Sequence, residues 1–244
     1  EALRKWTDDN TGNLLTDYTK DMSLDPETVL ALISTIYYKA EWTIHFYENS
    51  ATRETFHGAS GDTEVDMMHA TDFLSVYATD TFTSLGLPLN DSGNMYFFLP
   101  NENTDVSALA SDPELLAATR WCDDPHWTSP LVHLSVPKFS VSAKTDLLAT
   151  IASLGVSDVL DPEIADFTPL TEDVDELFLS QAEHAALVEI DENGVTAAAY
   201  TLLAITEGAA LPEDEIEFVL NRPFLFLITG RDGSLLFSGI VNNI

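Results

Sequence analysis

An uncharged run of eleven residues, Thr28–Tyr38, most constrains how this chain can fold. It is rich in β-branched and aromatic residues and stands between Pro26 and Lys39. A strand with one solvent-facing side alternates apolar and polar residues, whereas a continuously apolar strand is buried on both faces. The run therefore predicts a central strand of a large sheet.

Shorter apolar runs recur along the chain between turn-forming residues. They are rich in Val, Phe, Leu and Tyr, which favour strands. The further predicted strands are Phe73–Ala78, Ser84–Pro88, Met95–Leu99, Leu131–Val141, Phe178–Ile190, Glu215–Val219, Phe224–Thr229 and Leu235–Val241. A tight-turn signal at Arg231–Gly233 predicts that the last two form a buried terminal hairpin.

Helices are fewer in this sequence. Asp112 and Pro113 supply an N-cap and a first-turn proline for a predicted helix over Glu114–Arg120. Helical apolar spacing over Ala143–Leu154 ends at Gly155, a common C-terminal stop. The expected fold class is α+β, with antiparallel strands dominating.

The charge balance excludes some partners. The chain carries 41 acidic and 10 basic residues and a formal charge of −31, and such a field repels nucleic acid and anionic membranes. A solvated surface suited to solubility or high salt explains it most simply, and steering of a basic partner is the other interpretation. Residues 1–6 lack a signal-peptide core, so either the protein is cytoplasmic or its natural N-terminus lies upstream.

No combination of residues in the sequence matches a catalytic or metal-binding motif. Cys122 is the only cysteine, which excludes an intrachain disulfide and a Cys-rich zinc site. The chain has no Gly-x-Ser-x-Gly elbow, and His126 matches no ligand spacing. Asp191 and Glu192 are adjacent, so on a strand they point to opposite faces. The sequence predicts neither an enzyme nor a metal or cofactor site.

Residues 191–215 have a pattern that is unusual for a loop. In an extended conformation its alternate side chains, Val195, Ala197, Ala199, Thr201 and Leu203, share one uncharged face. Such a segment could enter a sheet without burying an unpaired charge. The alternatives are a short helix, because Thr-Ala-Ala-Ala favours one, or a connecting loop.

The motif Glu192-x-Gly194-x-x-Ala197-Ala198-Ala199 resembles the hinge of the serpins, a family of protease inhibitors. Further stretches resemble the same family: Thr28–Trp42, Met67–His69, Val136–Phe139, Leu154–Asp158, Asn221–Phe226 and Gly233–Gly239. The resemblance covers the C-terminal two-thirds of a serpin. It implies one serpin domain over residues 1–244 whose N-terminal part is absent, and which a separate chain could complete.

The resemblance also implies a function. Residues 191–214 would form the hinge and reactive-centre loop of a covalent, loop-inserting inhibitor of serine proteases. The implied hinge residues are Glu192, Gly194, Val195, Thr196, Ala197, Ala198 and Ala199. The family's spacing places the cut near Gly208–Ala209, with one residue of slack on either side, and the small residues there suit an elastase-like or subtilisin-like protease. With a shift of one residue, Glu207 would select a glutamate-preferring protease. The alternative is a non-inhibitory binding or chaperone-type serpin.

By the same resemblance, Trp42 and Lys138 would lie where the hinge enters the sheet, with a Lys138–Glu192 ion pair. His184 would lie at mid-sheet, where serpins bond it to an Asn; here that position is Ser34. The implied partner is a target serine protease and the implied location is extracellular or at the cell surface, with no cofactor.

Overall fold

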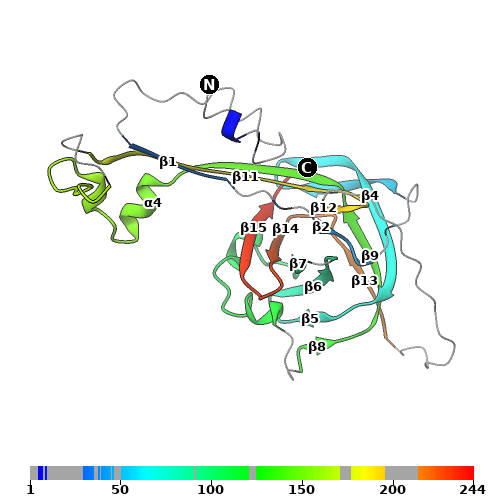
Figure 1. The fold of residues 1–244 in the computed structure, drawn as a ribbon. Coiled ribbons are helices and arrows are strands. Elements are labelled where there is room, and N and C mark those ends of the chain that lie inside the picture. The colour runs from blue at the N-terminus through cyan, green and yellow to red at the C-terminus, as the bar shows by residue number, and fades with distance from the viewer. Residues whose placement is uncertain are drawn as a thin grey trace. The chain divides into compact units, whose positions relative to one another are not determined.

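The computed structural model describes residues 5–7, 9, 30–35, 38, 40–44, 46, 51–90, 92–120, 125–170, 177–195 and 214–244. The chain forms two compact units. Unit 1 consists of Glu1–Tyr38 and Val141–Val188, and unit 2 of Lys39–Ser140 and Glu189–Ile244. Both units are built mainly from strands (Figure 1).

A three-stranded sheet organises unit 1. Its order is β1 (Leu30–Thr35), β11 (Leu179–Ile190) and β10 (Phe139–Asp146). β1 and β11 pair in parallel, with Ser34 beside His184. The short helix α4 (Leu148–Ser153) and the 3-10 turn η2 (Asp158–Leu160) follow β10 and contain no fully buried residue.

A six-stranded antiparallel sheet forms the core of unit 2, where β14 and β15 lie side by side (Figure 1). Every residue of β14 is buried. In sheet order the strands are β15 (Leu235–Val241), β14 (Phe224–Thr229), β7 (Asn94–Pro100), β6 (Phe82–Pro88), β5 (Val76–Ala78) and β8 (Trp127–Thr128). The helix α3 (Val106–Leu109) and the 3-10 turn η1 (Ala117–Thr119) lie between β7 and β8 in the chain.

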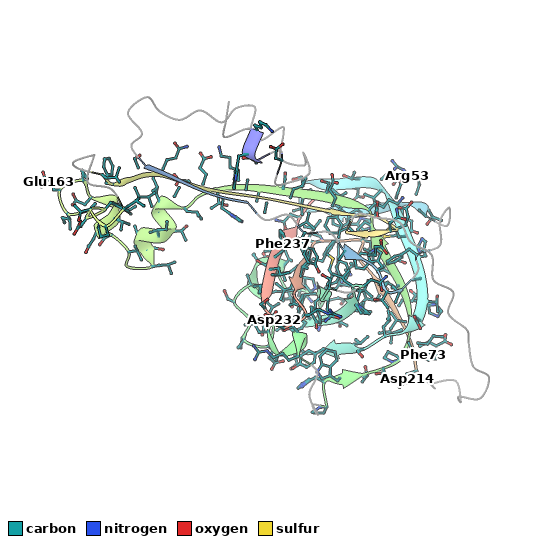
Figure 2. The ribbon with its side chains drawn as sticks, in the orientation of Figure 1. Arg53, Phe73, Glu163, Asp214, Asp232 and Phe237 are labelled. Carbon is teal, nitrogen blue, oxygen red and sulfur yellow. The ribbon has the colours of Figure 1, made fainter. Side chains whose placement is uncertain are left out.

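A second sheet of unit 2 has four strands. Its order is β13 (Glu215–Val219), β9 (Leu131–Pro137), β4 (Gly61–Phe73) and β3 (Thr52–Gly58). Phe73 pairs with Leu131, whose backbone nitrogen donates to Asp214, so Phe73 and Asp214 mark one end of this sheet (Figure 2). β13 pairs with β9 in parallel and begins directly after residues 196–213.

Phe224 connects several strands within unit 2. Its ring, which is fully buried, makes edge-to-face contacts with Phe56, Phe97 and Phe139 at centroid distances of 6.4, 6.0 and 5.6 Å. The three partners belong to β3, β7 and the start of β10. Aromatic pairs in this geometry add about 0.5–1.5 kcal/mol each beyond their buried area, so Phe224 holds several strands together.

Most predicted strands are present, and the terminal hairpin is confirmed. Gly233 has a φ of 78°, and the Gly230 nitrogen donates to the Ser234 oxygen across the turn. Its second strand is only partly buried, because Leu235 is 51% exposed. The predicted central strand over Thr28–Tyr38 is described over Leu30–Thr35 and lies at one end of the described three-stranded order. Hydrophobicity predicted a strand there but did not determine its place in the sheet.

Both predicted helices are wrong in part. Over Ala143–Leu154 the first residues extend β10 to Asp146, because pairing with β11 overrides their helical propensity. The Asp146 carboxylate then accepts from the Leu148 nitrogen, and α4 begins there. Over Glu114–Arg120 the chain forms only the 3-10 turn η1, although Asp112 does accept from the Glu114 nitrogen as a cap.

Other elements differ from prediction in their bounds. The strand predicted over Leu131–Val141 is two strands in different sheets. β9 stays paired with β4 as far as Lys138, whose backbone nitrogen donates to the Asp66 carbonyl, and from Phe139 the chain continues as β10 beside β11. The strand predicted over Phe73–Ala78 is likewise the end of β4 followed by β5. β3 and most of β4 were not predicted, because their polar residues hide the alternation. The four-residue helix α3 was not predicted either, because it is too short to show a helical period. No helix among the described residues is long and apolar enough to cross a membrane.

Replacing Phe224 by Ala should lower the free energy of unfolding by about 3–5 kcal/mol, because it removes three ring contacts and leaves a cavity. Phe73, which is 52% exposed, is the matched control, and Phe73→Ala should cost less than about 1 kcal/mol. Urea unfolding of both variants measures the difference. Equal losses in the two variants would contradict the assigned role of Phe224.

Candidate functional site

A two-residue strand pair in unit 2 lies at the start of the segment that the sequence predicts as a hinge. β12 (Gly194–Val195) pairs antiparallel with β2 (Ala40–Glu41). The register places Gly194 opposite Glu41 and Val195 opposite Ala40. The first hinge residues are therefore held as a strand by backbone hydrogen bonding.

The turn Asp191–Asn193 reverses the chain between β11 and β12. The Asp191 carboxylate accepts a hydrogen bond from the Asn193 backbone nitrogen at 2.8 Å. An Asp or Asn side chain that bonds the backbone two residues later favours a turn locally. The reversal is therefore encoded in the three residues that form it.

Trp42, which directly follows β2, stabilises this turn through hydrogen bonds. Its side chain is 3% exposed, and its ring meets Phe46 edge to face at 5.8 Å. The indole nitrogen donates to the Asp191 carbonyl at 2.8 Å, and the backbone nitrogen donates to the Asn193 carbonyl at 3.4 Å. Both bonds end on the turn, so Trp42 positions β12 against β2.

Lys138 and Glu192 form the ion pair that the serpin resemblance implies. The two side chains are 32% and 27% exposed. The Lys138 backbone nitrogen donates to the Asp66 carbonyl at 2.8 Å, which fixes the lysine to β4. The hydrogen bond from Lys138 lowers the pKa of Glu192 below its ordinary value, and burial and the charge of Asp66 oppose this shift only in part. Glu192 is therefore held ionised on the turn.

His184 and Ser34 belong to unit 1, where they are neighbours on the parallel strands β11 and β1. His184 is partly buried. Their hydrogen bond stays a prediction. The structure thus brings together Trp42, Lys138 and Glu192 in unit 2 and places the other two implied residues in unit 1.

Several predicted site residues lie outside the described part of the chain: Thr196, Ala197, Ala198, Ala199, Glu207, Gly208 and Ala209. Sequence reasoning missed the contributions of Asp66, Asp191 and Asn193. The spacing of Asp191 and Asn193 ahead of Gly194 is a turn signal that could have indicated two of them. The role of Asp66 is carried by its backbone carbonyl, which no side-chain pattern reveals.

What the described part of the site offers is backbone pairing. In the part of the chain that the structure describes, no cluster of three or more His, Cys, Asp or Glu side chains could hold a metal ion. A short strand pair, braced by a buried Trp and an ion pair and followed by an uncharged segment, has the geometry of strand addition. The fold and the site together define an α+β protein in which the predicted hinge begins as a short strand paired with β2.

Comparison with known proteins identifies the family. The family described as "Serpin (serine protease inhibitor)" matches residues 1–244, and the chain belongs to the serpin family, whose members are generally non-catalytic protease inhibitors. Serpin B11 of Mus musculus is 30% identical over 243 residues, covering 98% of this chain and 62% of that protein. Alpha-1-antiproteinase 2 of Equus caballus is 33% identical, covering 99% of this chain and 56% of that protein.

Solved structures agree on the fold. The native structure of tengpin, a thermophilic serpin, has a TM-score of 0.84 and 25% identity, covering 100% of this chain and 62% of tengpin. Human thyroxine-binding globulin complexed with its ligand has a TM-score of 0.82 and 28% identity, covering 99% and 63%. The chain thus spans about three-fifths of the length of these relatives.

Glu192→Gln should lower the free energy of unfolding at about pH 7 by roughly 0.5–1 kcal/mol, because the pair is partly exposed. A carboxylate with a lowered folded-state pKa stabilises above its unfolded pKa, and this stabilisation is lost as pH falls through the folded pKa. The gap between parent and variant should therefore close below about pH 4.

Thermal melts across this pH range measure the effect. Glu189→Gln is the matched control, because Glu189 is exposed on the same strand, β11. A gap that persists undiminished in acid, or an equal loss in the control, would contradict the assignment.

Proposed function

We propose that this protein is a suicide inhibitor of serine proteases in which residues 191–214 form the hinge and reactive-centre loop. The observation that carries the proposal is the β12–β2 pair, which starts the loop in strand form. In this mechanism the loop acts as bait. The serine of the protease attacks the carbonyl at the cut, the peptide bond breaks and releases a new amino terminus, and the strand that stays acyl-linked to the protease joins the main sheet. Strand addition of this kind is known for serpin loops.

The register of β12 on β2 indicates where the loop would go. If the same register continued along the inserted loop, Ala197 would pair with Tyr38 and Thr201 with Ser34. The loop would then lie along β1, in the position that β11 now occupies. An antiparallel strand inserted between β1 and β11 would break their parallel pairing and form one antiparallel pairing with each of them. Parallel pairing is slightly less stable per residue than antiparallel pairing, so the exchange favours insertion.

The charge pattern supports insertion. Val195, Ala197 and Ala199 are alternate positions that share one face of an extended loop, and their side chains are small and uncharged. Burying an unpaired charge costs several kcal/mol, and each net backbone hydrogen bond contributes about 1 kcal/mol. A loop without charge on this face can therefore insert with a net gain.

We place the reactive bond between Gly208 and Ala209, with an elastase-like or subtilisin-like target. The small residues on both sides of the bond support this choice. A shift of one residue makes Glu207 the specificity residue and a glutamate-preferring protease the target. We also propose that chain outside these 244 residues completes the fold, and that the protein acts outside the cell or at its surface.

The alternative is a non-inhibitory serpin that binds a small ligand. It is favoured by the likeness to human thyroxine-binding globulin, which was solved with its ligand bound. Against it stands the small, uncharged hinge, since bulky or charged hinge residues would block insertion. Formation of a covalent complex distinguishes the two.

The protein at its full natural length, incubated with an elastase-like protease, should form a complex that survives boiling in detergent. The acyl bond is covalent, whereas ordinary inhibitor complexes dissociate. Mass spectrometry of the released C-terminal peptide should show a new start at Ala209, or at Gly208 if Glu207 is the specificity residue. The same protease with its active-site serine blocked is the control. Cleavage without a stable complex would favour the non-inhibitory alternative.

Ala197→Arg should convert the protein from inhibitor to substrate, and Val195→Arg should do the same, because a guanidinium would enter the sheet unpaired. The ratio of inhibitor consumed to protease inactivated should rise at least about tenfold. Ala197→Val keeps the position apolar and is the matched control, which should stay close to the parent. An unchanged ratio in both arginine variants would exclude insertion in this register.

A further inference from the structure

A hollow of about 830 Å³ with charged and polar residues in its lining lies in unit 2 and shares no residue with the candidate site around Trp42, Lys138 and Glu192. The segment after β7, the start of α3, the residues before β14 and the end of the chain line it. Among the lining residues are Pro100, Glu102, Asn103, Arg222 and Asn242. Its volume falls in the range of small-molecule sites, about 300–1,000 Å³.

Arg222 is the cation of this hollow. Its guanidinium donates one hydrogen bond, from Nη2 to the Pro100 carbonyl at 2.8 Å. Lys138 and Arg53 each form an ion pair, whereas Arg222 forms none with a carboxylate among the described residues. A guanidinium has five N–H donors, so most of those of Arg222 remain available to a ligand. Partial burial lowers the pKa of Arg222, and the negative charge of Glu102 opposes this effect.

The walls around Arg222 are held in place by the fold. Asn101 donates from its backbone to the Thr81 carbonyl at 2.9 Å and from its side chain to the Thr79 carbonyl at 2.8 Å. Pro223 restricts the backbone of Arg222 to extended conformations, and Pro223 lines the hollow itself. A site whose walls are fixed beforehand loses little ordering entropy when a ligand binds.

Two carboxylates line the hollow, and they differ in the hydrogen bonds that they accept. Asp105 caps α3: one of its carboxylate oxygens, Oδ1, accepts from both the backbone nitrogen and the hydroxyl of Ser107. Glu102 is exposed, and none of its oxygens accepts a hydrogen bond from a described residue. Its charge acts on Arg222, so the hollow presents a positive group with the carboxylate of Glu102 close to it.

We propose that this hollow binds a small zwitterion of the amino-acid type, whose carboxylate pairs with Arg222 and whose ammonium group pairs with Glu102. A guanidinium is matched to a carboxylate because the two form parallel N–H···O bonds. The amides of Asn103 and Asn242 supply further donors and acceptors. This function is separate from protease inhibition and does not depend on it.

The charge of the whole chain selects among anionic ligands. With a formal charge of −31, the chain repels phosphate and other dianions over long range. A zwitterion carries no net charge and escapes this repulsion, yet it still offers a carboxylate to Arg222. A simple carboxylate would leave Glu102 facing a second negative charge, which costs affinity.

Calorimetry with the protein at its full natural length tests the proposal. The probes are alanine and phenylalanine as zwitterions, acetate as the carboxylate alone, methylamine as the ammonium alone, and inorganic phosphate as the dianion. We expect saturable binding of at least one amino acid with a Kd of about 1 mM or tighter. Acetate, methylamine and phosphate should each bind at least about tenfold more weakly.

Two variants and one control complete the test. Arg222→Gln should abolish binding of the amino acid, and Glu102→Gln should weaken it about tenfold while leaving acetate binding equal or stronger. Arg53→Gln removes a cation that lies outside the hollow and should change nothing. If Arg222→Gln fails to fold, Glu102→Gln decides. The proposal is overturned if no amino acid binds, if acetate or phosphate binds as tightly as the amino acids, or if Glu102→Gln leaves amino-acid binding unchanged.

Discussion

The reversal of the chain at Asp191–Asn193 is the constraint on which the rest of the site depends. β11 brings the chain to this turn, and β12 leaves it already paired with β2. Two residues of pairing would be marginal alone, since even a whole isolated hairpin is marginal in water. Trp42 supplies what the short ladder lacks, because it is buried and donates to both ends of the turn. The Lys138–Glu192 pair adds a charge-assisted bond on the same three residues.

Much of the fold could be predicted from sequence because continuous runs of apolar, β-branched and aromatic residues indicate buried strands. β14 has six buried residues and was predicted with its correct bounds. The failures occurred where pairing, which is not local, decides the conformation. Residues 143–146 have helical spacing but extend β10. β3 and β4 carry many charged and polar residues, and only their cross-strand partners show that they are strands.

The site was predictable to the extent that motifs carry it. The hinge motif indicated Glu192 and Gly194, and the resemblance implied Trp42 and Lys138. What could not be predicted is the backbone chemistry: the Asp66 carbonyl that fixes Lys138, and the Asp191 and Asn193 carbonyls that accept from Trp42. Every residue has a carbonyl, so sequence does not distinguish the ones that matter. The hollow around Arg222 could not be predicted either, because its walls come from four segments that are separate in the sequence.

The composition of the loop is best understood against the acidity of the whole chain. Acidic residues number 41 in 244, or about one in six, so fourteen residues of average composition would carry two or three. The fourteen residues from Asn193 to Thr206 carry none, and Glu192 and Glu207 flank them. A permanently exposed loop in an acidic protein gains nothing from such an absence, since charge there is solvated and favours solubility. A segment that must pass from water into a sheet does gain, because each buried unpaired carboxylate would oppose insertion. If the loop inserts as proposed, its lack of charge and the acidity of the rest of the chain follow from the same electrostatics: charge is favourable on residues that stay in water and costly on residues that enter a sheet.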